Sequence, residues 1–522
     1  MSPGEVPVLL FDMIAAGAQR HPDKAAAIFG EERISCAELV ARSDRVASWL
    51  TSRGVGPGDR VAILCGNEMP ALVYFWGILK AGAQTVDMPT LAGRATMQGI
   101  LDEARPKAIV ADAAQVTKHI VVDADPLRIP ELLVTTAEGK QTAAAAGMTA
   151  YSDVEILAAG LPAPERPDVS PDDVAMIVYT SGTTGRPNGV MLSHANFIEN
   201  LRASNELMGL TADDSILVVV PLYYIHGRMQ LLLHAMLGGT VVFSGGFQFP
   251  AKVHAELCDS GVTGFSGVPY HFKQLLQRSK IAAKPPPSLR YVLITGGALS
   301  ATGLKDLSAA LPGVGLHLAY GQTEAAPRIT WIGPDELFVK EGSVGRALPN
   351  VTLEILGPDE QPVGAEQVGE VAAGGPNIMK GYVSGDEVEL GKIDAQGRLR
   401  TGDLGRLDVD GHLFLMGRSS EMIKSAGERI FPQEIEDVIG AHDSVREVAV
   451  VGIPDDTLGE KIVAYVVLAE GHEVDRATFR GHCLERLPFV RVPKEFRAVD
   501  ELPKTASGKV SRGKLKQIAR QA

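Results

Sequence analysis

The chain has 522 residues, of which 45% are hydrophobic and 22% are charged. A single hydrophobic core stops growing at about 250 to 300 residues, so the length indicates at least two independently packed lobes. The composition is that of a folded globular chain and argues against disorder. With 50 basic and 63 acidic residues, the net charge is −13. This charge repels phosphate backbones and anionic membranes, which makes nucleic acid a poor candidate partner.

The cysteines and the apolar stretches indicate a reducing compartment and no membrane insertion. Four scattered cysteines form no C-x-x-C pair: Cys36, Cys65, Cys258 and Cys483. Chains of this size seldom need disulfides, so we expect reduced thiols. The first residues carry Glu5 and Asp12 where a secretory signal would carry positive charge. The most apolar stretch, "ILVVVPLYYI", is interrupted by Pro221 and is too short to span a bilayer. The expected location is the cytoplasm.

Strand-like apolar runs alternate with amphipathic stretches through the first two thirds of the chain. The runs cover 60–66, 108–112, 175–180, 215–220, 240–245 and 291–297. The stretch 68–83 is typical of the helices between them, and this alternation predicts β-α-β units with parallel sheets. After Gly342 the pattern changes to short strands and Gly/Asp turns, which predicts a small β-rich subdomain. From Arg418 helix and strand signals return.

These signals together predict an α/β fold. We expect a large N-terminal domain, residues 1–417, made of two β-α-β type sheet subdomains plus a small distorted β-barrel. A small α+β C-terminal domain, residues 418–522, should follow it.

The segment "VYTSGTTGRPNGV", Val178 to Val190, combines glycines and hydroxyl side chains directly after a buried-looking strand. Val174 to Tyr179 is predicted to be this strand, and Ser193 is predicted to cap the helix that begins "HANFIENL". Glycines let backbone N–H groups approach an anion closely, so a loop between strand and helix could bind phosphate. The Walker pattern G-x-x-x-x-G-K-[ST] does not occur in the chain. Taken alone, the segment could also be a flexible surface loop.

Seven further motifs accompany this loop in a fixed order. They are "ITGGALS", "AYGQTEAAPR", "GSVGRALPN", "GEVAAGGPNIMKGY", "RTGDLGRLDVDGHLFLMGR", "EMIKSAGERIFPQEIE" and "LPKTASGKVSRGKL". With "YTSGTTGRPNGVMLSH" they resemble the adenylate-forming superfamily of acyl- and aryl-CoA ligases, carrier-protein adenylation enzymes and luciferases. The resemblance covers nearly the whole chain. It implies an AMP-forming ligase that uses ATP and Mg²⁺.

The resemblance assigns a nucleotide site. The implied cofactor-binding residues are Thr180, Ser181, Gly182, Thr183, Thr184, Gly185, Asn188, Gly296, Gly297, Ala298, Tyr320, Gly321, Gln322, Asp403, Arg418 and Lys424. Within this set the resemblance implies that Tyr320 stacks on adenine, that Asp403 holds both ribose hydroxyls and that Arg418 adds a forked contact. An aromatic face suits a purine, and a carboxylate offers two acceptors to a diol.

Three residues are implied to be catalytic. Thr323 would contact the α-phosphate, and Glu324 would hold the magnesium ion, which prefers carboxylate oxygens. Lys509, in the basic segment "KTASGKVSRGKL", matches the lysine that bridges the substrate carboxylate and the α-phosphate. A cation placed there stabilises the charge that develops when the carboxylate attacks ATP. "GRSSEMIKSAGERI" resembles the hinge about which the small domain rotates, bringing a face around Gly427 to the pantetheine thiol.

The chain departs from this superfamily at two places. Asn188 stands where relatives usually have Lys, and neutral hydrogen bonds are weaker than charge-assisted ones, so we expect weaker ATP binding. In the acyl-pocket segment "PLYYIHGRMQ", Tyr224 replaces the His of many aryl and fatty acid ligases. The predicted substrate-binding residues are Tyr223, Tyr224, His226 and Arg228, together with Gly297. They favour an acid with a polar group or a second anion.

Three functions are compatible with the sequence. The first is ATP-dependent adenylation of an aromatic or otherwise polar acid, followed by transfer to CoA or to the phosphopantetheine of a carrier protein. The second is a diazotase-type enzyme that activates nitrite with ATP and converts an aryl amine to a diazo group, because fold alone does not fix the acid. The third is a catalytically silent nucleotide-binding protein, against which the retained Glu324, Asp403 and Lys509 argue.

Overall fold

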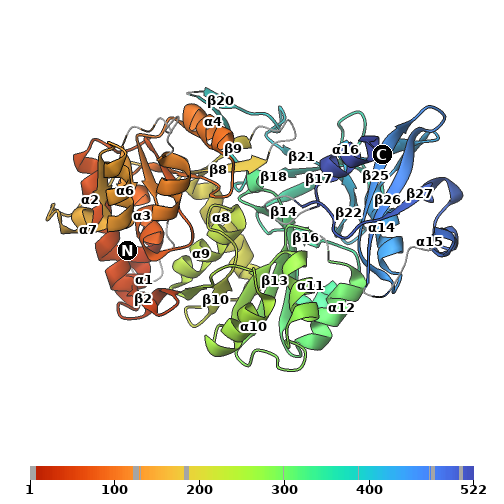
Figure 1. Ribbon diagram of the computed structural model, residues 1–522, viewed down its shortest axis with the longest axis horizontal. Coiled ribbons are helices and arrows are strands. Elements are labelled where there is room, and N and C mark those ends of the chain that lie inside the picture. The colour runs from red at the N-terminus through yellow and green to blue at the C-terminus, as the bar shows by residue number, and fades with distance from the viewer. Residues whose placement is uncertain are drawn as a thin grey trace.

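The computed structural model describes residues 8–121, 129, 131–181, 187–297, 299–385, 387–469, 471, 476–504 and 510–521. A large N-terminal part contains three sheets, and the C-terminal residues form a separate body with a fourth sheet at one end of the molecule (Figure 1). The predicted α/β class, with a large and a small domain, is confirmed. No helix of the described chain is both long enough and apolar enough to cross a membrane.

The first nine-stranded sheet is parallel over β3 to β8 and has the order β20-β19-β9-β8-β4-β3-β5-β6-β7. Its strands are β3 (Arg60–Leu64), β4 (Gln84–Asp87), β5 (Ala108–Ala111), β6 (Leu132–Val134), β7 (Ala150–Ser152), β8 (Val174–Ser181), β9 (Pro187–Ser193), β19 (Gly381–Ser384) and β20 (Glu387–Glu389). The helices α2 (Cys36–Ser52), α3 (Met69–Lys80), α4 (Arg94–Ala104), α5 (Ala113–Gln115), α6 (Ala137–Ala145) and α7 (Asp153–Ala158) belong to this region, with a π-helical turn at Val116–Ile120. The near-continuous apolar runs of β3, β5 and β8 fit strands that are covered on both faces.

The second nine-stranded sheet has the order β16-β15-β14-β13-β12-β10-β11-β1-β2. Its strands are β1 (Ala25–Phe29), β2 (Glu32–Ser35), β10 (Ser215–Val218), β11 (Thr240–Phe243), β12 (Gly264–Gly267), β13 (Tyr291–Thr295), β14 (Gly315–Gly321), β15 (Arg328–Ile332) and β16 (Arg346–Ala347). Its helices are α1 (Asp12–Arg20), α8 (His194–Met208), α9 (Ile225–Leu237), α10 (Pro250–Asp259), α11 (Pro269–Arg278), α12 (Ala301–Ala310) and α13 (Pro334–Leu337). Helices α8 and α9 lie between the two large sheets (Figure 1).

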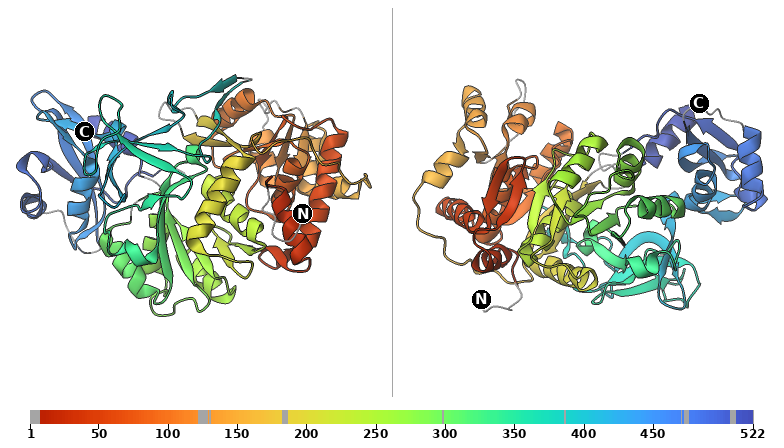
Figure 2. Two further views of the ribbon diagram at one scale, coloured as in Figure 1. Left: turned by 180° about the vertical axis from the view of Figure 1, so that it is seen from behind. Right: turned by 90° about the horizontal axis from the view of Figure 1, so that it is seen from below.

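The β-rich subdomain is an antiparallel four-stranded sheet of order β17-β18-β21-β22. Its strands are β17 (Thr352–Leu356), β18 (Gly369–Gly374), β21 (Leu399–Leu407) and β22 (Leu413–Arg418). The small domain follows with β23 (Ile423–Ser425), β24 (Glu428–Ile430), β25 (Val445–Asp455), β26 (Gly459–Leu468) and β27 (Glu495–Ala498), and with α14 (Pro432–Gly440), α15 (Arg476–Leu484) and α16 (Arg512–Gln521). Both turned views place it beside this four-stranded sheet (Figure 2). The exact boundary at residues 417 and 418 stays a prediction.

The phosphate-loop segment differs from the expected strand, loop and helix. β8 turns back through an antiparallel partner, β9, so the glycine- and hydroxyl-rich residues connect two strands of a hairpin. The reason is the apolar run Val190 to Leu192, whose side chains are buried. The helix α8 then begins at His194 as predicted, with the Ser193 hydroxyl accepting a hydrogen bond from the Asn196 N–H (3.2 Å).

Candidate active site

Tyr320, Asp403 and Arg418 come together although two sheets supply them. The Tyr320 hydroxyl donates to one carboxylate oxygen of Asp403 (2.6 Å), and Arg418 Nε lies 3.1 Å from the other. Asp403 on β21 is the register partner of Arg418 on β22, while Tyr320 lies near the end of β14. Burial and the Asp403 carboxylate raise the pKa of Tyr320 well above its usual value, so Tyr320 is a neutral donor. Three residues predicted for one nucleoside thus meet at one carboxylate.

The backbone after Tyr320 requires glycine. A Cβ on Gly321 would lie 1.9 Å from the carbonyl oxygen of Pro327, a distance that no side chain can occupy. Gln322 follows in extended conformation, and Thr323 begins a short 3₁₀ turn in which its side chain is half-buried. The predicted α-phosphate residue is therefore held by a sharp reversal of the chain directly beside Tyr320.

Glu324 is a buried carboxylate that is kept ionised by two residues that the sequence analysis did not single out. It accepts hydrogen bonds from the Tyr382 hydroxyl (2.7 Å) and from Lys392 Nζ (2.8 Å), and Lys392 also donates to the Gln322 amide oxygen (3.3 Å). Burial alone would raise the pKa of Glu324, but Lys392 and Tyr382 outweigh it and hold the pKa below its usual value. An ionised carboxylate suits Mg²⁺. "GEVAAGGPNIMKGY" already contains Tyr382, which only tertiary contact marks as a partner of Glu324.

The described residues of the predicted phosphate loop lie at the end of β8 and the start of β9. Thr180 is the register partner of Asn188, and its hydroxyl lies 3.4 Å from the Asn188 carbonyl oxygen. The Asn188 side chain is exposed. Ser181 ends β8. The predicted residues Gly182, Thr183, Thr184 and Gly185 lie outside the described residues.

Gly296 and Gly297 line the end of β13. Added Cβ atoms would lie 3.2 Å from Val268 and 3.4 Å from Pro269, so any larger side chain would press on the start of α11. Gly296 also has φ +78°, which favours glycine. Gly296 and Gly297 together are called the glycine wall below, and their assignment to the nucleotide and substrate sites stays a prediction. Ala298 lies outside the described residues.

Lys504, which precedes the segment that carries Lys509, lies next to the large domain. Lys504 Nζ lies 4.8 Å from the ring centroid of Tyr270 on α11, and Lys504 pairs with Val510 across the loop. Lys509 itself lies outside the described residues. Since Tyr270 directly follows Pro269, which would lie 3.4 Å from a Cβ on Gly297, Lys504 lies near the glycine wall.

The other small-domain residue predicted to bind the nucleotide, Lys424, lies on β23 with its side chain exposed. Its backbone N–H donates to the Glu460 carboxylate (2.7 Å). The assignment of Lys424 to the nucleotide site stays a prediction.

The predicted substrate residues Tyr223, Tyr224 and His226 form the start of α9. The two tyrosine rings pack 4.5 Å apart, and His226 Nε2 lies 2.7 Å from the hydroxyl of Ser266 on β12. The Ser266 hydroxyl in turn lies 3.2 Å from the Leu293 carbonyl oxygen on β13. His226 therefore points toward the strand ends that lead to the glycine wall.

Arg228, the fourth residue predicted to bind substrate, is buried and paired with an acidic residue of the protein. It is 2% exposed and forms a two-point ion pair with Asp87 at the end of β4, with N–O distances of 2.7 and 3.1 Å. Its guanidinium also lies 4.0 Å from the ring centroid of Phe75. The sequence could not reveal this partner, because Asp87 precedes Arg228 by 141 residues. The ion pair joins α9 to β4, and Arg228 Nη1 has no hydrogen-bond partner. The assignment of Arg228 to substrate binding stays a prediction.

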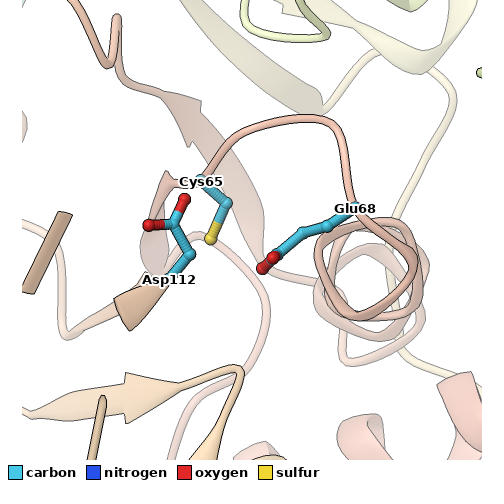
Figure 3. Close-up of side chains that lie close together, drawn as sticks. All are labelled: Cys65, Glu68 and Asp112. Carbon is cyan, nitrogen blue, oxygen red and sulfur yellow. The ribbon is translucent and has the colours of Figure 1, made fainter. Parts of the chain in front are cut away.

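Two clusters of acidic and other metal-ligating side chains have their ligand atoms close enough together to hold a metal ion. Figure 3 shows Cys65, Glu68 and Asp112 converging at the ends of β3 and β5, with ligand atoms within 4.8 Å of one another. Burial raises the pKa of the Cys65 thiol well above its usual value and raises the pKa of Glu68 to about 7. Metal ligands must be deprotonated, so this chemistry does not favour a metal.

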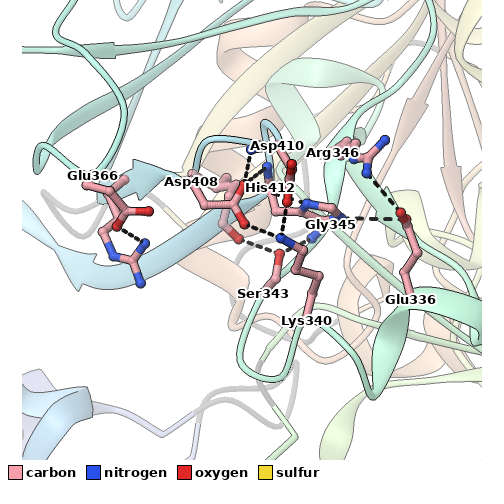
Figure 4. A network of polar contacts seen from close by, with 11 residues as sticks. Glu336, Lys340, Ser343, Gly345, Arg346, Glu366, Asp408, Asp410 and His412 are labelled. Atoms are coloured by element: carbon pink, nitrogen blue, oxygen red, sulfur yellow. Dashed lines mark hydrogen bonds and ion pairs between the residues drawn. The ribbon is translucent and has the colours of Figure 1, made fainter.

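The second group is the turn at Asp408, Asp410 and His412 (Figure 4). Lys340 Nζ lies 2.8 Å from Asp408 and also contacts Asp410, so an ammonium group already neutralises both carboxylates. The Asp408 carboxylate accepts from the His412 N–H (2.9 Å). The group lies in the turn of the hairpin formed by β21 and β22.

Comparison with known proteins identifies the family. A profile described as "AMP-binding enzyme" matches residues 14–383, and one described as "AMP-binding enzyme C-terminal domain" matches residues 434–509. The chain belongs to the AMP-binding enzyme family. This membership confirms the predicted resemblance and the enzyme class, an AMP-forming ligase.

Three relatives span the whole chain. An indoleacetate–CoA ligase of Aromatoleum aromaticum is 33% identical and covers 98% of both chains. ATP-bound MatB of Rhodopseudomonas palustris is 28% identical with a TM-score of 0.86, over 98% of this chain and 99% of MatB. An o-succinylbenzoate coenzyme A synthetase of Bacillus subtilis, in complex with ATP and magnesium ion, is 28% identical with a TM-score of 0.80, over 97% and 99% of the chains.

The buried ion pair of Asp87 and Arg228 predicts different stabilities for variants that remove one or both of its charges. Arg228→Met leaves a buried carboxylate unpaired and should lower the free energy of unfolding by about 3–5 kcal/mol. The double variant Asp87→Leu/Arg228→Met removes both charges and should recover most of this loss. Urea unfolding of the wild type and the two variants measures the effect. A double variant as unstable as the single one would show that the charge pairing is not what matters here.

The ion pair of Lys392 with Glu324 predicts how the effect of Lys392→Met on stability depends on pH. The pKa of Glu324 in the folded protein lies below its usual value of 4.5, so its stabilisation is present above that pH and is lost as the pH falls through the lowered pKa. In Lys392→Met, burial should raise the pKa of Glu324, and ionisation of Glu324 then lowers stability as the pH rises. The Tm difference between wild type and variant should widen from about pH 4 to about pH 7. The corresponding difference in the free energy of unfolding should reach about 1–2 kcal/mol after allowing for the partial exposure of Lys392.

The matched control is Lys380→Met, which removes a lysine from an exposed ion pair with Asp172. Its Tm difference from wild type should stay nearly constant with pH. Equal pH profiles of Lys392→Met and Lys380→Met would contradict the assignment of Lys392 as the counterion of Glu324.

Proposed function

We propose that this enzyme activates an aryl or otherwise polar carboxylic acid with ATP and transfers the acyl group to the thiol of CoA. The observation that carries the proposal is the meeting of Tyr320, Asp403 and Arg418 beside an ionised Glu324. The relatives named for indoleacetate and o-succinylbenzoate support an aryl acid and CoA as the acceptor.

In the first step, the acid carboxylate attacks the α-phosphorus of ATP, and the bond to pyrophosphate breaks. Tyr320 orients the adenine, and Asp403 accepts hydrogen bonds from the ribose hydroxyls once its present partners rearrange. Thr323 donates to an α-phosphate oxygen. Glu324 would hold Mg²⁺, which would supply charge neutralisation at the phosphates.

The small domain supplies the remaining charge. Lys509 would reach the α-phosphate from the loop whose ends, Lys504 and Val510, border the large domain at Tyr270. Its ammonium group stabilises the oxygens on which negative charge builds. In the second step, the CoA thiol attacks the acyl carbon and AMP leaves. We place this step after rotation of the small domain, which would bring the exposed turn at Gly427 to the cleft.

The test is a screen for AMP release with ATP and Mg²⁺ across aryl, alkyl and dicarboxylic acids, each with and without CoA. The expected result is acid-dependent pyrophosphate exchange without CoA and a thioester product with it. AMP formation that requires nitrite and an aryl amine, with no role for CoA, would replace the proposal by the diazotase reaction. Absence of turnover with every acid and with nitrite would indicate a silent nucleotide-binding protein.

Replacement of Lys509 tests the catalytic cation. Lys509→Ala should lower the rate of acyl-adenylate formation by at least about 100-fold, because a preorganised charge at the transition state is lost, while ATP affinity changes by less than about threefold. Lys514→Ala, on the exposed face of α16, is the matched control and should keep the wild-type rate. Pyrophosphate exchange and equilibrium ATP binding measure the two effects. An undiminished exchange rate in Lys509→Ala would rule out its assigned role.

Replacement of Asn188 tests whether position 188 contacts the phosphates of ATP. Asn188→Lys should lower the KM for ATP by about three- to tenfold, because a charge-assisted contact replaces a neutral one. Asn188→Gln keeps a neutral amide and should leave the KM unchanged. Steady-state kinetics at saturating acid gives both values, and equal KM values for Asn188→Lys and the wild type would show that position 188 does not contact the phosphates.

A further inference from the structure

Lys392 places an ammonium group on the carboxylate that is predicted to hold magnesium. Its Nζ atom lies 2.8 Å from Glu324 Oε1 and 3.3 Å from the Gln322 amide oxygen. The Glu324 side chain is 8% exposed and the Lys392 side chain is 37% exposed, so the lysine reaches a buried acid from the solvent side. Among the ion pairs of the described residues, this is the one that Glu324 forms. A metal ion that binds Glu324 therefore meets an ammonium group already there.

The backbone of Lys392 is held in place, whereas its side chain is not enclosed. Its carbonyl oxygen accepts a hydrogen bond from the Arg400 N–H (2.8 Å). The preceding residue, Gly391, has φ +55°, and a Cβ there would lie 2.6 Å from the Tyr382 ring. The turn is thus packed against Tyr382, while the long, partly exposed side chain of Lys392 can change rotamer.

Strand β19 connects this turn to the predicted phosphate loop. Tyr382 on β19 is the register partner of Val190 on β9, and its hydroxyl donates to Glu324 (2.7 Å). Side chains of paired residues, and of residues two positions apart, lie on the same face of a sheet. Asn188 precedes Val190 by two residues, so it shares this face with Tyr382 as a diagonal neighbour. Diagonal neighbours are about 7–8 Å apart, a distance that a long side chain spans.

Charge determines what Lys392 does when ATP and magnesium bind. A divalent cation at Glu324 repels an ammonium group on the same carboxylate, because like charges at such short distances interact strongly in a partly buried site. The triphosphate of ATP brings several negative charges to the same region. Asn188 offers the phosphates only neutral hydrogen bonds, whereas an ammonium group forms charge-assisted ones. Electrostatics therefore drives Lys392 away from Glu324 and toward the phosphates.

We propose that Lys392 changes partner, from Glu324 in the nucleotide-free enzyme to the β- or γ-phosphate of ATP when Mg²⁺ occupies Glu324. Lys392 thereby supplies the positive charge that Asn188 does not. The proposal rests on the proposed function, which assigns the α-phosphate to Thr323 and Mg²⁺ to Glu324. It adds a nucleotide-binding residue that lies outside every motif of the resemblance, between "GEVAAGGPNIMKGY" and "RTGDLGRLDVDGHLFLMGR".

A purely structural counterion would give a different result. If Lys392 only neutralises Glu324, its removal frees the carboxylate for Mg²⁺, and MgATP should bind equally or more tightly. If Lys392 moves to the phosphates, its removal deletes a charge-assisted contact, and MgATP should bind more weakly. AMP lacks the β- and γ-phosphates, so its affinity should stay the same.

Isothermal titration calorimetry with MgATP and with AMP measures these affinities. Lys392→Met should raise the Kd for MgATP by about tenfold or more and change the Kd for AMP by less than about twofold. Lys392→Arg keeps the charge and should recover most of the lost affinity. Lys380→Met is the matched control, because the Lys380 side chain is also 37% exposed and forms an ion pair with Asp172 (2.7 Å). It should keep both wild-type affinities.

A double variant tests whether Lys392 and position 188 serve the same phosphates. Asn188→Lys should lower the Kd for MgATP by a larger factor in the Lys392→Met background than in the wild type, which already has one cation there. Equal factors in the two backgrounds would show that Lys392 does not replace a cation at position 188, which overturns the proposal.

Binding and turnover separate this proposal from the proposed function. An unchanged or lowered Kd for MgATP in Lys392→Met overturns the change of partner, while acid-dependent pyrophosphate exchange keeps the proposed function. An equal loss of AMP affinity also overturns it, because the effect would then be structural. If MgATP binding weakens selectively in Lys392→Met but no acid supports AMP release, the proposed function fails and the change of partner stands. A wild type that does not bind MgATP overturns both.

Discussion

The Asp403 carboxylate is the contact on which the arrangement of the site depends. It accepts from Tyr320 on the second large sheet and pairs with Arg418 at the end of the four-stranded sheet. Buried carboxylates need such partners, since an unpaired one would be protonated or would destabilise the fold. The same contact therefore joins β14 of the second large sheet to the β-rich subdomain, and it holds the residues predicted to bind adenine and ribose close together.

From this contact a continuous series of polar interactions leads into the small domain. Arg418 is followed at once by the turn Ser419–Glu421, and Glu421 accepts from Arg512 Nη1 (2.9 Å). Arg512 also donates to both oxygens of Glu436 (2.8 Å each). Because Arg512 follows the lysine loop by two residues, the base of that loop is tied to the hinge segment and to α14. We therefore expect the base of the lysine loop and the predicted hinge segment to move together.

The sequence predicted those parts of the fold and site that local patterns determine. Ser193 caps α8 because a hydroxyl before an apolar-periodic stretch is a local signal, and Tyr320, Asp403 and Arg418 come together because their motifs carry fixed roles. The motifs could not predict ion-pair partners that are distant in sequence and come close only in the folded chain. Lys392 lies 68 residues after Glu324, and Asp87 lies 141 residues before Arg228. The β9 strand was missed because glycine and hydroxyl residues obscured a short apolar run.

Arg228 and Arg328 illustrate the same limit. Both are buried arginines in motifs with an implied role, and sequence reasoning selected Arg228 because it stands in the acyl-pocket segment. The fold gives them different surroundings: Asp87 pairs with Arg228, whereas Arg328 has no carboxylate partner among the described residues and lies 5.5 Å from the ring centroid of Trp331. The partner of a buried arginine lies on another segment, so no single stretch of sequence reveals it.

The packing of the small domain is compatible with the proposed rotation, which would move Lys509 toward and away from the large domain without unfolding either domain. Two apolar clusters cover its sheet, one centred on Ile435 and Phe479 and the other on Tyr465 and Leu515, and within the described chain both draw only on residues 423–519. The domain thus keeps its own core when it moves. Its contact with the large domain at Lys504 and Tyr270 is a cation over an aromatic ring, which is weak at an exposed site. The proposed rotation would break this contact without opening either apolar cluster of the small domain, as expected of domains that move relative to each other.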